Sequence, residues 1–242
     1  MITETHQIRV GGLTVDVVRK DIKNLHLAVY PPVGRIRVAV PLQVNDEAVR
    51  LAVISRLAWI KRQKIKFTNQ ARQSKREYVS GESHYVNGQR YRLNVVYQNG
   101  ASKVAIRNKT SIDLFVPIAS DKAYRERAIL AWYRQQIKEC IPVLIAQWEL
   151  IVGVKVADWR IKQMKTKWGT CNIEAQRIWL NLELAKKSTQ CLEYIIVHEM
   201  VHLLERHHND RFTELMDEFM PRWRLHREEL NQSSLGHEEW EY

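Results

Sequence analysis

The chain begins with alternating apolar and polar residues. Between Leu13 and Val40 the segments LTVDVV, LHLAVY and RIRVAV follow this pattern, with the turn residues PPVG between the last two. A period of two predicts strands with one buried face, and the turn predicts an antiparallel hairpin. Apolar residues then recur every three or four positions after Asn45, which predicts an N-capped helix over residues 45–67.

The strand pattern returns in the middle of the chain. The short alternating segments EYV, HYV, RYRLNVVY, KVAIRN and IDLFVP are separated by Asn-Gly pairs at positions 87 and 99, which favour tight turns. A long helical pattern follows from Asp121 to about Val152, and we expect Pro142 within it to kink or divide the helix. No internal repeat is visible in these patterns.

The last third adds further strands before an apolar helix. VADWRIKQMKTKWGTCN and RIWLNLEL predict strands, and CLEYIIVHEMVHLLE predicts a helix with Ser188 or Thr189 as its N-cap. Strands early and helices late predict an α+β fold and not a doubly wound parallel sheet. We expect a β-rich region with antiparallel hairpins and one helix over residues 1–118, and a second domain over residues 119–242.

Composition places the chain among globular proteins. Of its 242 residues 45% are hydrophobic and 27% charged. No segment reaches the roughly 18 to 20 apolar residues of a membrane span, and the start MITETHQIRVGGL lacks the features of a signal peptide. We therefore expect a cytoplasmic protein without a membrane partner. Its three cysteines form no CxxC pair, which argues against a disulfide framework and a cysteine-only zinc site.

Basic residues are in excess and partly clustered. The formal net charge is +11 and the pI is about 9.6. Between Arg56 and Arg76 the run RLAWIKRQKIKFTNQARQSKR contains no acidic residue. Such a run is compatible with a solvated helix face followed by a polar loop, and also with a surface that contacts the phosphates of a nucleic acid or a nucleotide.

Candidate chemistry is concentrated in residues 197–208, which read VHEMVHLLERHH. On a helix His198 and His202 lie side by side, about 40° apart around the axis and one turn apart along it. Glu199 is rotated by about 100°, where it approaches a water on a metal without being a ligand, as H-E-x-x-H does in metalloproteases. The alternative to a metal site is that these histidines are ordinary core or surface residues. Burying them without hydrogen-bond partners or a metal would, however, cost several kcal/mol.

A third ligand is needed, because catalytic zinc usually has three protein ligands and a water. His208 is the first choice: its spacing equals that of HExxHxxGxxH, although Glu205 occupies the glycine position. A positive φ at His207 or Asn209 would make the required turn. Imidazole also suits other divalent transition metals. The other candidate ligands are His207, Glu214 and Glu218.

These segments resemble the YgjP-like family of predicted metal-dependent hydrolases, which is related to the WLM and SprT-like zincins. The resemblance extends from about Val18 to Leu230 and depends mostly on KTKWGTCN and YIIVHEMVHLLERHHNDRF, with support from VRKDIKNLHLAVYPPVGRIRVAVP and REYVSGESHYVNGQRYRL. It implies a zincin-like catalytic domain over 119–242 with a zinc ion and His208 as third ligand. His207 departs from the asparagine usual in the family.

The segment KTKWGTCN resembles the WGSC segment of that family. By this resemblance it borders the active-site cleft, which makes Lys165, Lys167 and Trp168 candidates for substrate binding along a strand edge. Alternatively, Trp168 and Cys171 pack beneath the helix as core residues.

Together these features predict a zinc-dependent hydrolase with a metal-activated water and Glu199 as the general base. The relation to zincins implies a metallopeptidase with a peptide substrate. A nucleoside triphosphate pyrophosphohydrolase, an activity associated with the YgjP-like family, is the alternative that would use the basic surplus. A nucleic-acid-binding module with a structural metal is a third hypothesis, although such a site normally has four protein ligands.

Overall fold

The chain forms two compact units in the computed structural model, the first within residues 1–71 and the second within residues 72–238. The expected boundary between residues 118 and 119 falls inside the second unit, so a division there stays a prediction. The structure describes the following residues: 4–30, 33–69, 76–164 and 167–232.

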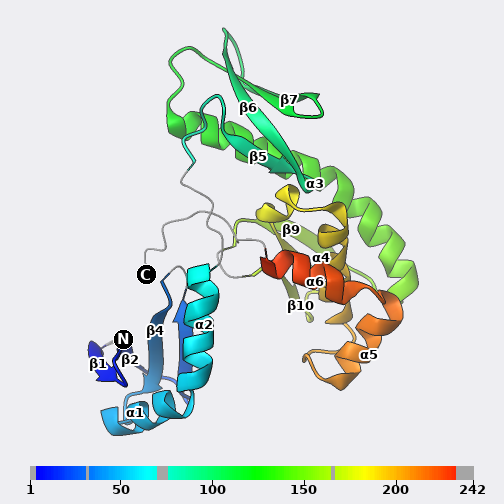
Figure 1. Ribbon diagram of the computed structural model, residues 1–242. Helices are drawn as coiled ribbons and strands as arrows, with labels where there is room; N and C mark the ends of the chain where they lie inside the picture. Colours follow the sequence, from blue (N-terminus) through cyan, green and yellow to red (C-terminus); the bar gives the residue numbers. More distant parts are fainter. Residues whose placement is uncertain (1–3, 31–32, 70–75, 165–166, 233–242) are drawn as a thin grey trace. The chain divides into compact units, whose positions relative to one another are not determined.

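The first unit combines a four-stranded sheet with helices (Figure 1). Its elements are β1 (Glu4–Val10), β2 (Leu13–Lys20), β3 (His26–Tyr30), β4 (Arg35–Pro41), α1 (Asp46–Ser55) and α2 (Leu57–Asn69). In the order β1-β2-β4-β3, the two outer pairs are antiparallel and the central pair is parallel. The strands predicted between Leu13 and Val40 are confirmed, whereas β1 was not predicted.

The helix predicted over 45–67 is instead two helices. Asn45 does cap α1, since its side chain accepts a hydrogen bond from the Ala48 amide at 2.9 Å. The first helix ends at Ser55, and its C-cap Arg56 leaves the helical conformation with φ −113° and ψ 10°. The break is compatible with packing on both sides of it, because Val53 of α1 and Ile60 of α2 are both fully buried in the core of this unit.

A second four-stranded sheet opens the second unit. Its strands are β5 (Ser83–Val86), β6 (Gln89–Tyr97), β7 (Lys103–Asn108) and β8 (Ser111–Val116). Their order, β5-β6-β8-β7, and their pairing directions are the same as in the first sheet. The register of the central pair also agrees: Val15 lies opposite Ile36 in one sheet, and Leu93 lies opposite Ile112 in the other.

The two four-stranded sheets therefore repeat one strand topology, which the sequence patterns do not reveal. In both units a proline at the end of the last strand precedes the N-cap residue of the next helix by the same interval: Pro41 and Asn45, then Pro117 and Asp121. The two copies share few residue types and their hairpins differ in length, so the repeat is visible in the strand pairing and not in the letters.

Helix α3 (Lys122–Val152) follows the second sheet and continues through Pro142 (Figure 1). The predicted division at Pro142 was therefore wrong, whereas a kink there stays a prediction. The proline lacks an amide hydrogen, but neighbouring turns are anchored by Ile137, Ile141 and Ile145, which are all buried. Tertiary packing of this face stabilises a helix that local propensity would interrupt.

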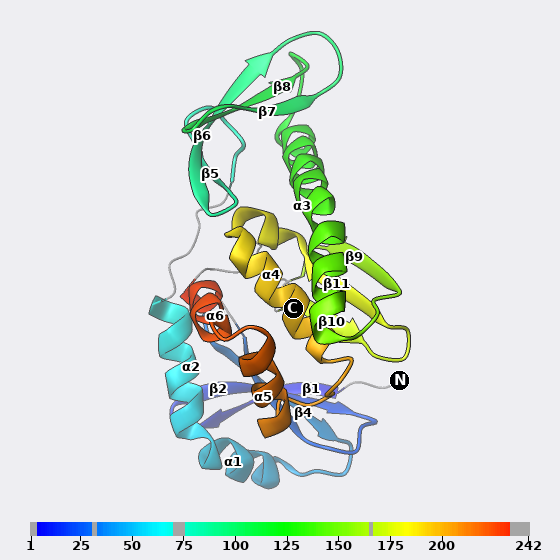
Figure 2. The ribbon, with the colours of Figure 1, turned by 90° about the vertical axis from the view of Figure 1, so that its right-hand side faces the viewer.

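The remaining elements comprise a small sheet, with strand order β10-β11-β9, and several helices. They are β9 (Asp158–Lys162), β10 (Gly169–Asn172), β11 (Arg177–Asn181), the 3-10 helix η1 (Leu182–Lys186), α4 (Thr189–Val201), α5 (Asp210–Phe219) and α6 (Trp223–Gln232). Ser188 caps α4, as predicted. This helix contacts α3, α6 and the strands β10 and β11 (Figure 2). The α+β fold class is confirmed.

Within the described residues, no helix combines the length and the apolar character that crossing a membrane requires. The cytoplasmic location stays a prediction.

Candidate metal centre

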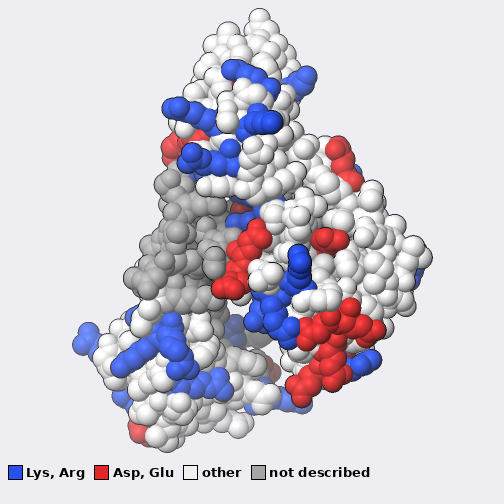
Figure 3. Space-filling model, turned by 45° about the vertical axis from the view of Figure 1, so that its right-hand side comes forward, with Lys and Arg blue, Asp and Glu red and all other residues white. Residues whose placement is uncertain are grey.

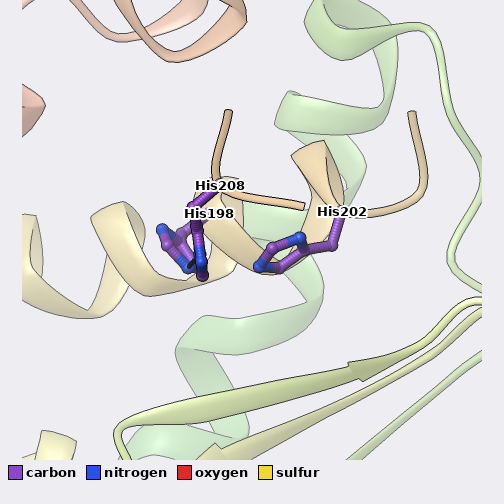
Figure 4. Close-up of side chains that lie close together, drawn as sticks. All are labelled: His198, His202 and His208. Carbon is purple, nitrogen blue, oxygen red and sulfur yellow. Dashed lines mark hydrogen bonds between the residues drawn. The ribbon is translucent and has the colours of Figure 1, made fainter. Parts of the chain in front are cut away.

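Three histidines converge at the C-terminal end of α4. His198 lies in the helix, His202 is its C-cap residue, and His208 lies just before α5. One ring nitrogen from each can be chosen so that all lie within 4.8 Å of one another. The Nε2 atoms of His198 and His208 are 3.0 Å apart. Figure 4 shows the ring of His202 pointing toward the other two.

The return of the chain to His208 differs from the predicted turn. After Val201 the amides of Leu203, Leu204 and Glu205 donate to carbonyl oxygens of the last helical turn, at 2.9 Å each. Neither His207 nor Asn209 has a positive φ, so that part of the prediction was wrong. Asn209 acts instead as the N-cap of α5, because its side chain accepts the Phe212 amide at 3.0 Å.

Glu205 explains how the turn forms without the glycine of the HExxHxxGxxH pattern. Its carbonyl oxygen lies 3.1 Å from Nδ1 of His202, and its carboxylate accepts the His207 amide at 3.0 Å. A proton on Nδ1 that is donated to this carbonyl leaves the Nε2 lone pair of His202 available to a cation. The backbone of Glu205 orients the imidazole while its side chain closes the turn.

Phe212 of α5 packs against all three imidazoles. It is 3% exposed, and its ring centroid lies 5.0 Å from that of His198 and 4.7 Å from those of His202 and His208. We did not predict this role. In the sequence Phe212 is one apolar residue of an amphipathic helix, and nothing in that pattern distinguishes it from a core residue.

The electrostatics of His198 and His202 fit a divalent cation. Burial, then the neighbouring His202 and His208, lowers the pKa of His198 to about 3. Burial also lowers the pKa of His202. Neutral imidazoles offer lone pairs, and the Nε2 atoms of His198 and His208, which lie 3.0 Å apart, can both direct a lone pair at one ion. The other candidate ligands do not belong to this convergent group: His207, Glu214 and Glu218.

Glu199 lies beside the histidines and is 4% exposed. Burial raises the pKa of its carboxyl group to about 8, and the charge of Lys167 acts in the opposite direction. A carboxylate that is poorly solvated is a stronger base, and the pKa of Glu199 would fall again with a cation nearby. The position and the environment both suit proton transfer.

A cleft of about 1000 Å³ opens over Glu199 and the histidines. One wall is β10, whose outer edge has no partner strand among the described residues, and α6 contributes residues elsewhere in the lining. Lys167 and Trp168 line this cleft, whereas Lys165 lies outside the described residues. Trp168 and Cys171 both line the cleft and pack against the hydrophobic core, so the two interpretations of these residues are compatible.

Asn181 fixes the backbone that leads into β10. It is fully buried, and its Nδ2 donates to the carbonyl oxygens of Met164 and Lys167 at 2.8 Å. Its own amide donates to the carbonyl of Trp168, also at 2.8 Å. We did not predict this residue, although an asparagine inside the apolar run RIWLNLEL was a usable signal, because a buried amide needs partners.

Tyr194 and Arg227 were also not predicted, and both line the cleft. The Tyr194 ring meets the His198 ring edge-on with centroids 5.8 Å apart. Burial raises the pKa of Tyr194 to about 12, and the positive charge of Arg227 opposes this shift. The same charge contributes to the low pKa of His198. Arg227 is therefore an electrostatic neighbour of the histidines, although it comes from another helix.

The basic run from Arg56 to Arg76 is only partly described. Arg56, Lys61 and Arg62 are exposed. Figure 3 shows Lys and Arg at the surface of the first unit, at lower left. Contact with nucleic acid stays a prediction. The basic side chains of this run outside the described set are Lys66, Arg72 and Lys75.

A helix with HExxH, a third convergent histidine and an open cleft define the class of metal-dependent hydrolases. The family model described as YgjP-like, metallopeptidase domain matches residues 23–233, and the chain belongs to this family. The predicted resemblance and enzyme class are thereby confirmed.

The other comparisons add little. No curated protein matches the chain. The crystal structure of the metallopeptidase zymogen of Pyrococcus abyssi abylysin is similar to part of it, with 19% identity and a TM-score of 0.35 over 37% of this chain and 90% of that one.

Proposed function

We propose that this metal-dependent hydrolase is a zinc peptidase, in which His198, His202 and His208 hold the metal and Glu199 is the general base. The observation that carries the proposal is the convergence of the three imidazoles within 4.8 Å beside a buried carboxylate in an open cleft. These donors match the ligand set of a catalytic zinc site, with one position left for solvent or substrate.

Each group has a separate task in hydrolysis. When bound, zinc would polarise the substrate carbonyl and lower the pKa of water from about 16 to about 7. Glu199 accepts the proton of the attacking water and delivers it to the leaving amine. Glu205 and Phe212 keep the imidazoles of His202 and His208 in place during this transfer.

The edge of β10 supports a peptide as the substrate. Gly169 to Asn172 line the cleft, and their outer backbone groups have no partner strand among the described residues. An extended peptide adds to such an edge through main-chain hydrogen bonds, so it needs no particular sequence to bind. The same contacts would place its carbonyl groups over Glu199.

Phosphoanhydride hydrolysis is the rival activity, because Lys167, Arg206 and Arg227 line the cleft and cations bind phosphates. The test uses purified, zinc-loaded protein against an unstructured protein and against a panel of nucleoside triphosphates. We expect cleavage of the polypeptide only, and its loss in Glu199→Gln with the metal retained. Turnover of nucleotides alone, or full activity of Glu199→Gln, would contradict the proposal.

A further inference from the structure

The cleft has two ends, which can be placed along α4. Trp168 lies toward the start of this helix, because the Lys187 Nζ atom is 5.5 Å from its ring. Gly169 comes next and faces Ile195 and Glu199. The strand β10 therefore runs in the same direction as α4, with Lys167 at one end of the cleft and the residues after Asn172 at the other.

The far end of the cleft is mostly apolar. Ile173 and Leu204 are 37% and 47% exposed, and Leu203 also lines the cleft. The two charged residues of the lining that lie beyond β10 and α4, Glu174 and Arg206, have opposite signs. A hydrophobic side chain of a substrate that covers Ile173, Leu203 and Leu204 would remove apolar surface from water and so stabilise the complex.

The near end includes Arg227 of α6, because nearby Glu229 of the same helix accepts a hydrogen bond at 2.9 Å from Ser188, the N-cap of α4. The guanidinium carbon of Arg227 lies 4.9 Å from the centroid of Trp223, which is buried. The Trp223 ring is stacked on Tyr194, with centroids 6.3 Å apart and 16° between the planes. Tyr194 in turn meets His198. Contacts between rings thus connect Arg227 to the metal centre and restrict its orientation.

A neighbouring arginine shows what is distinctive about Arg227. Arg224 lies over the same Trp223 ring at 4.6 Å, but it forms an ion pair with Asp217 and does not line the cleft. No ion pair or hydrogen bond within the described part of the chain involves Arg227. A planar guanidinium fits a carboxylate through two parallel hydrogen bonds, which would supply the missing partner.

We propose that Arg227 is a specificity residue that binds a carboxylate of the substrate, while Ile173, Leu203 and Leu204 accept an apolar side chain at the opposite end of the cleft. The preferred substrate is then a peptide with an apolar residue on one side of the cleaved bond and an acidic group on the other. This inference rests on the proposed peptidase function. Either an Asp or Glu side chain or a free C-terminus can supply the carboxylate.

Binding to Glu199→Gln tests the inference without turnover. Labelled short peptides with leucine on one side and either glutamate or glutamine on the other are titrated by fluorescence anisotropy, each as a C-terminal acid and as an amide. We expect roughly tenfold tighter binding of peptides with a carboxylate, which corresponds to about 1.4 kcal/mol. The acid and amide forms identify which source of the carboxylate the site accepts.

Variants of the two arginines provide the matched comparison. In Arg227→Gln the preference for glutamate should vanish, in Arg227→Glu it should turn toward lysine, and in Arg224→Gln it should persist. Arg227→Lys should keep part of it, because the charge remains and the second hydrogen bond is lost. The proposal would be overturned if, in Glu199→Gln, glutamate and glutamine peptides bind equally as amides and the acid and amide forms also bind equally. An equal effect of Arg224→Gln would overturn it as well.

Kinetics separate this inference from the proposed function. If zinc-loaded protein cleaves acidic and neutral peptides equally well, Arg227 is not a specificity residue, although the peptidase function stands. A loss of kcat that is the same for both peptides in Arg227→Gln leads to the same conclusion. If no peptide is cleaved and Glu199→Gln still prefers glutamate through Arg227, the carboxylate site stands and the peptidase function fails.

Discussion

The backbone of Gly169 passes so close to Glu199 that a larger residue at this position would have to displace neighbouring side chains. A Cβ atom on Gly169 would lie 2.5 Å from Oε1 of Glu199 and 2.9 Å from its Cγ. It would also lie 2.8 Å from Cγ2 of Ile195. The φ angle of Gly169 is not in the positive range, so space and not backbone conformation requires the glycine. The contact explains the glycine of the WGTC segment and fixes the proposed base.

Gly169→Ala should therefore displace the Glu199 carboxylate. We expect kcat to fall by roughly 100-fold, since a shift of about 1 Å in a catalytic group has an effect of that size. KM and zinc content should change little, because the strand edge and the histidines remain. Steady-state kinetics and elemental analysis provide the measurements.

A double-mutant cycle tests the same contact without activity. In a Glu199→Ala background the Cγ and Oε1 atoms are gone, so Gly169→Ala should destabilise the protein less than in the parent chain, although the clash with Ile195 remains. Chemical denaturation measures both costs. If they are equal, Glu199 does not depend on Gly169 for its position.

His208 and its neighbour His207 offer a matched test of the third ligand. His208→Ala should reduce zinc affinity strongly, because a nitrogen that lies 3.0 Å from that of His198 is removed. His207→Ala should retain zinc, since this exposed residue does not belong to the convergent group. Metal content after dialysis measures both; the opposite ranking would assign the ligand to His207.

Phe212→Leu should lower zinc affinity by roughly tenfold, because it removes the aromatic ring that packs against all three imidazoles. Competition with a chelator gives the affinity. Phe219→Leu, on the same helix and partly buried against the core, is the control that should lower stability alone. Similar zinc affinities for the two variants would mean that Phe212 only fills space.

Acid should destabilise the second unit through His84. Burial, then the charge of Arg76, lowers the pKa of His84 from 6.5 to about 4. Between these values the unfolded chain binds more protons at His84 than the folded one. The contribution of His84 to stability is therefore fully present above pH 6.5 and is lost as the pH falls toward 4. The free energy of unfolding should fall by about 3 kcal/mol over this range.

His84→Gln is the comparison for this pH dependence. Glutamine is uncharged and can still hydrogen bond to Tyr133, whose hydroxyl lies 3.5 Å from Nδ1 of His84. Urea unfolding of metal-free protein at several pH values should show a shallower slope in the variant than in the parent. Parallel slopes would show that other groups cause the acid sensitivity.

The sequence by itself determined the local part of the site. The spacing of His198, Glu199 and His202 fixes their relative directions, because the backbone of a helix repeats every 3.6 residues or so. His208 follows closely enough for one turn to bring it back. The alternation of apolar and polar residues likewise predicted most strands, because successive side chains of a strand point to opposite faces of the sheet.

Only the tertiary structure decided which elements meet. Gly169 against Glu199, and Arg227 near His198, are contacts between segments far apart in the chain, and residue spacing has no bearing on them. The same holds for the helix that continues through Pro142 and for the repeated strand order. These features depend on how whole faces of helices and sheets pack together. Sequence patterns report only the geometry within one helix or strand, because the backbone dihedrals of that element fix the directions of its side chains.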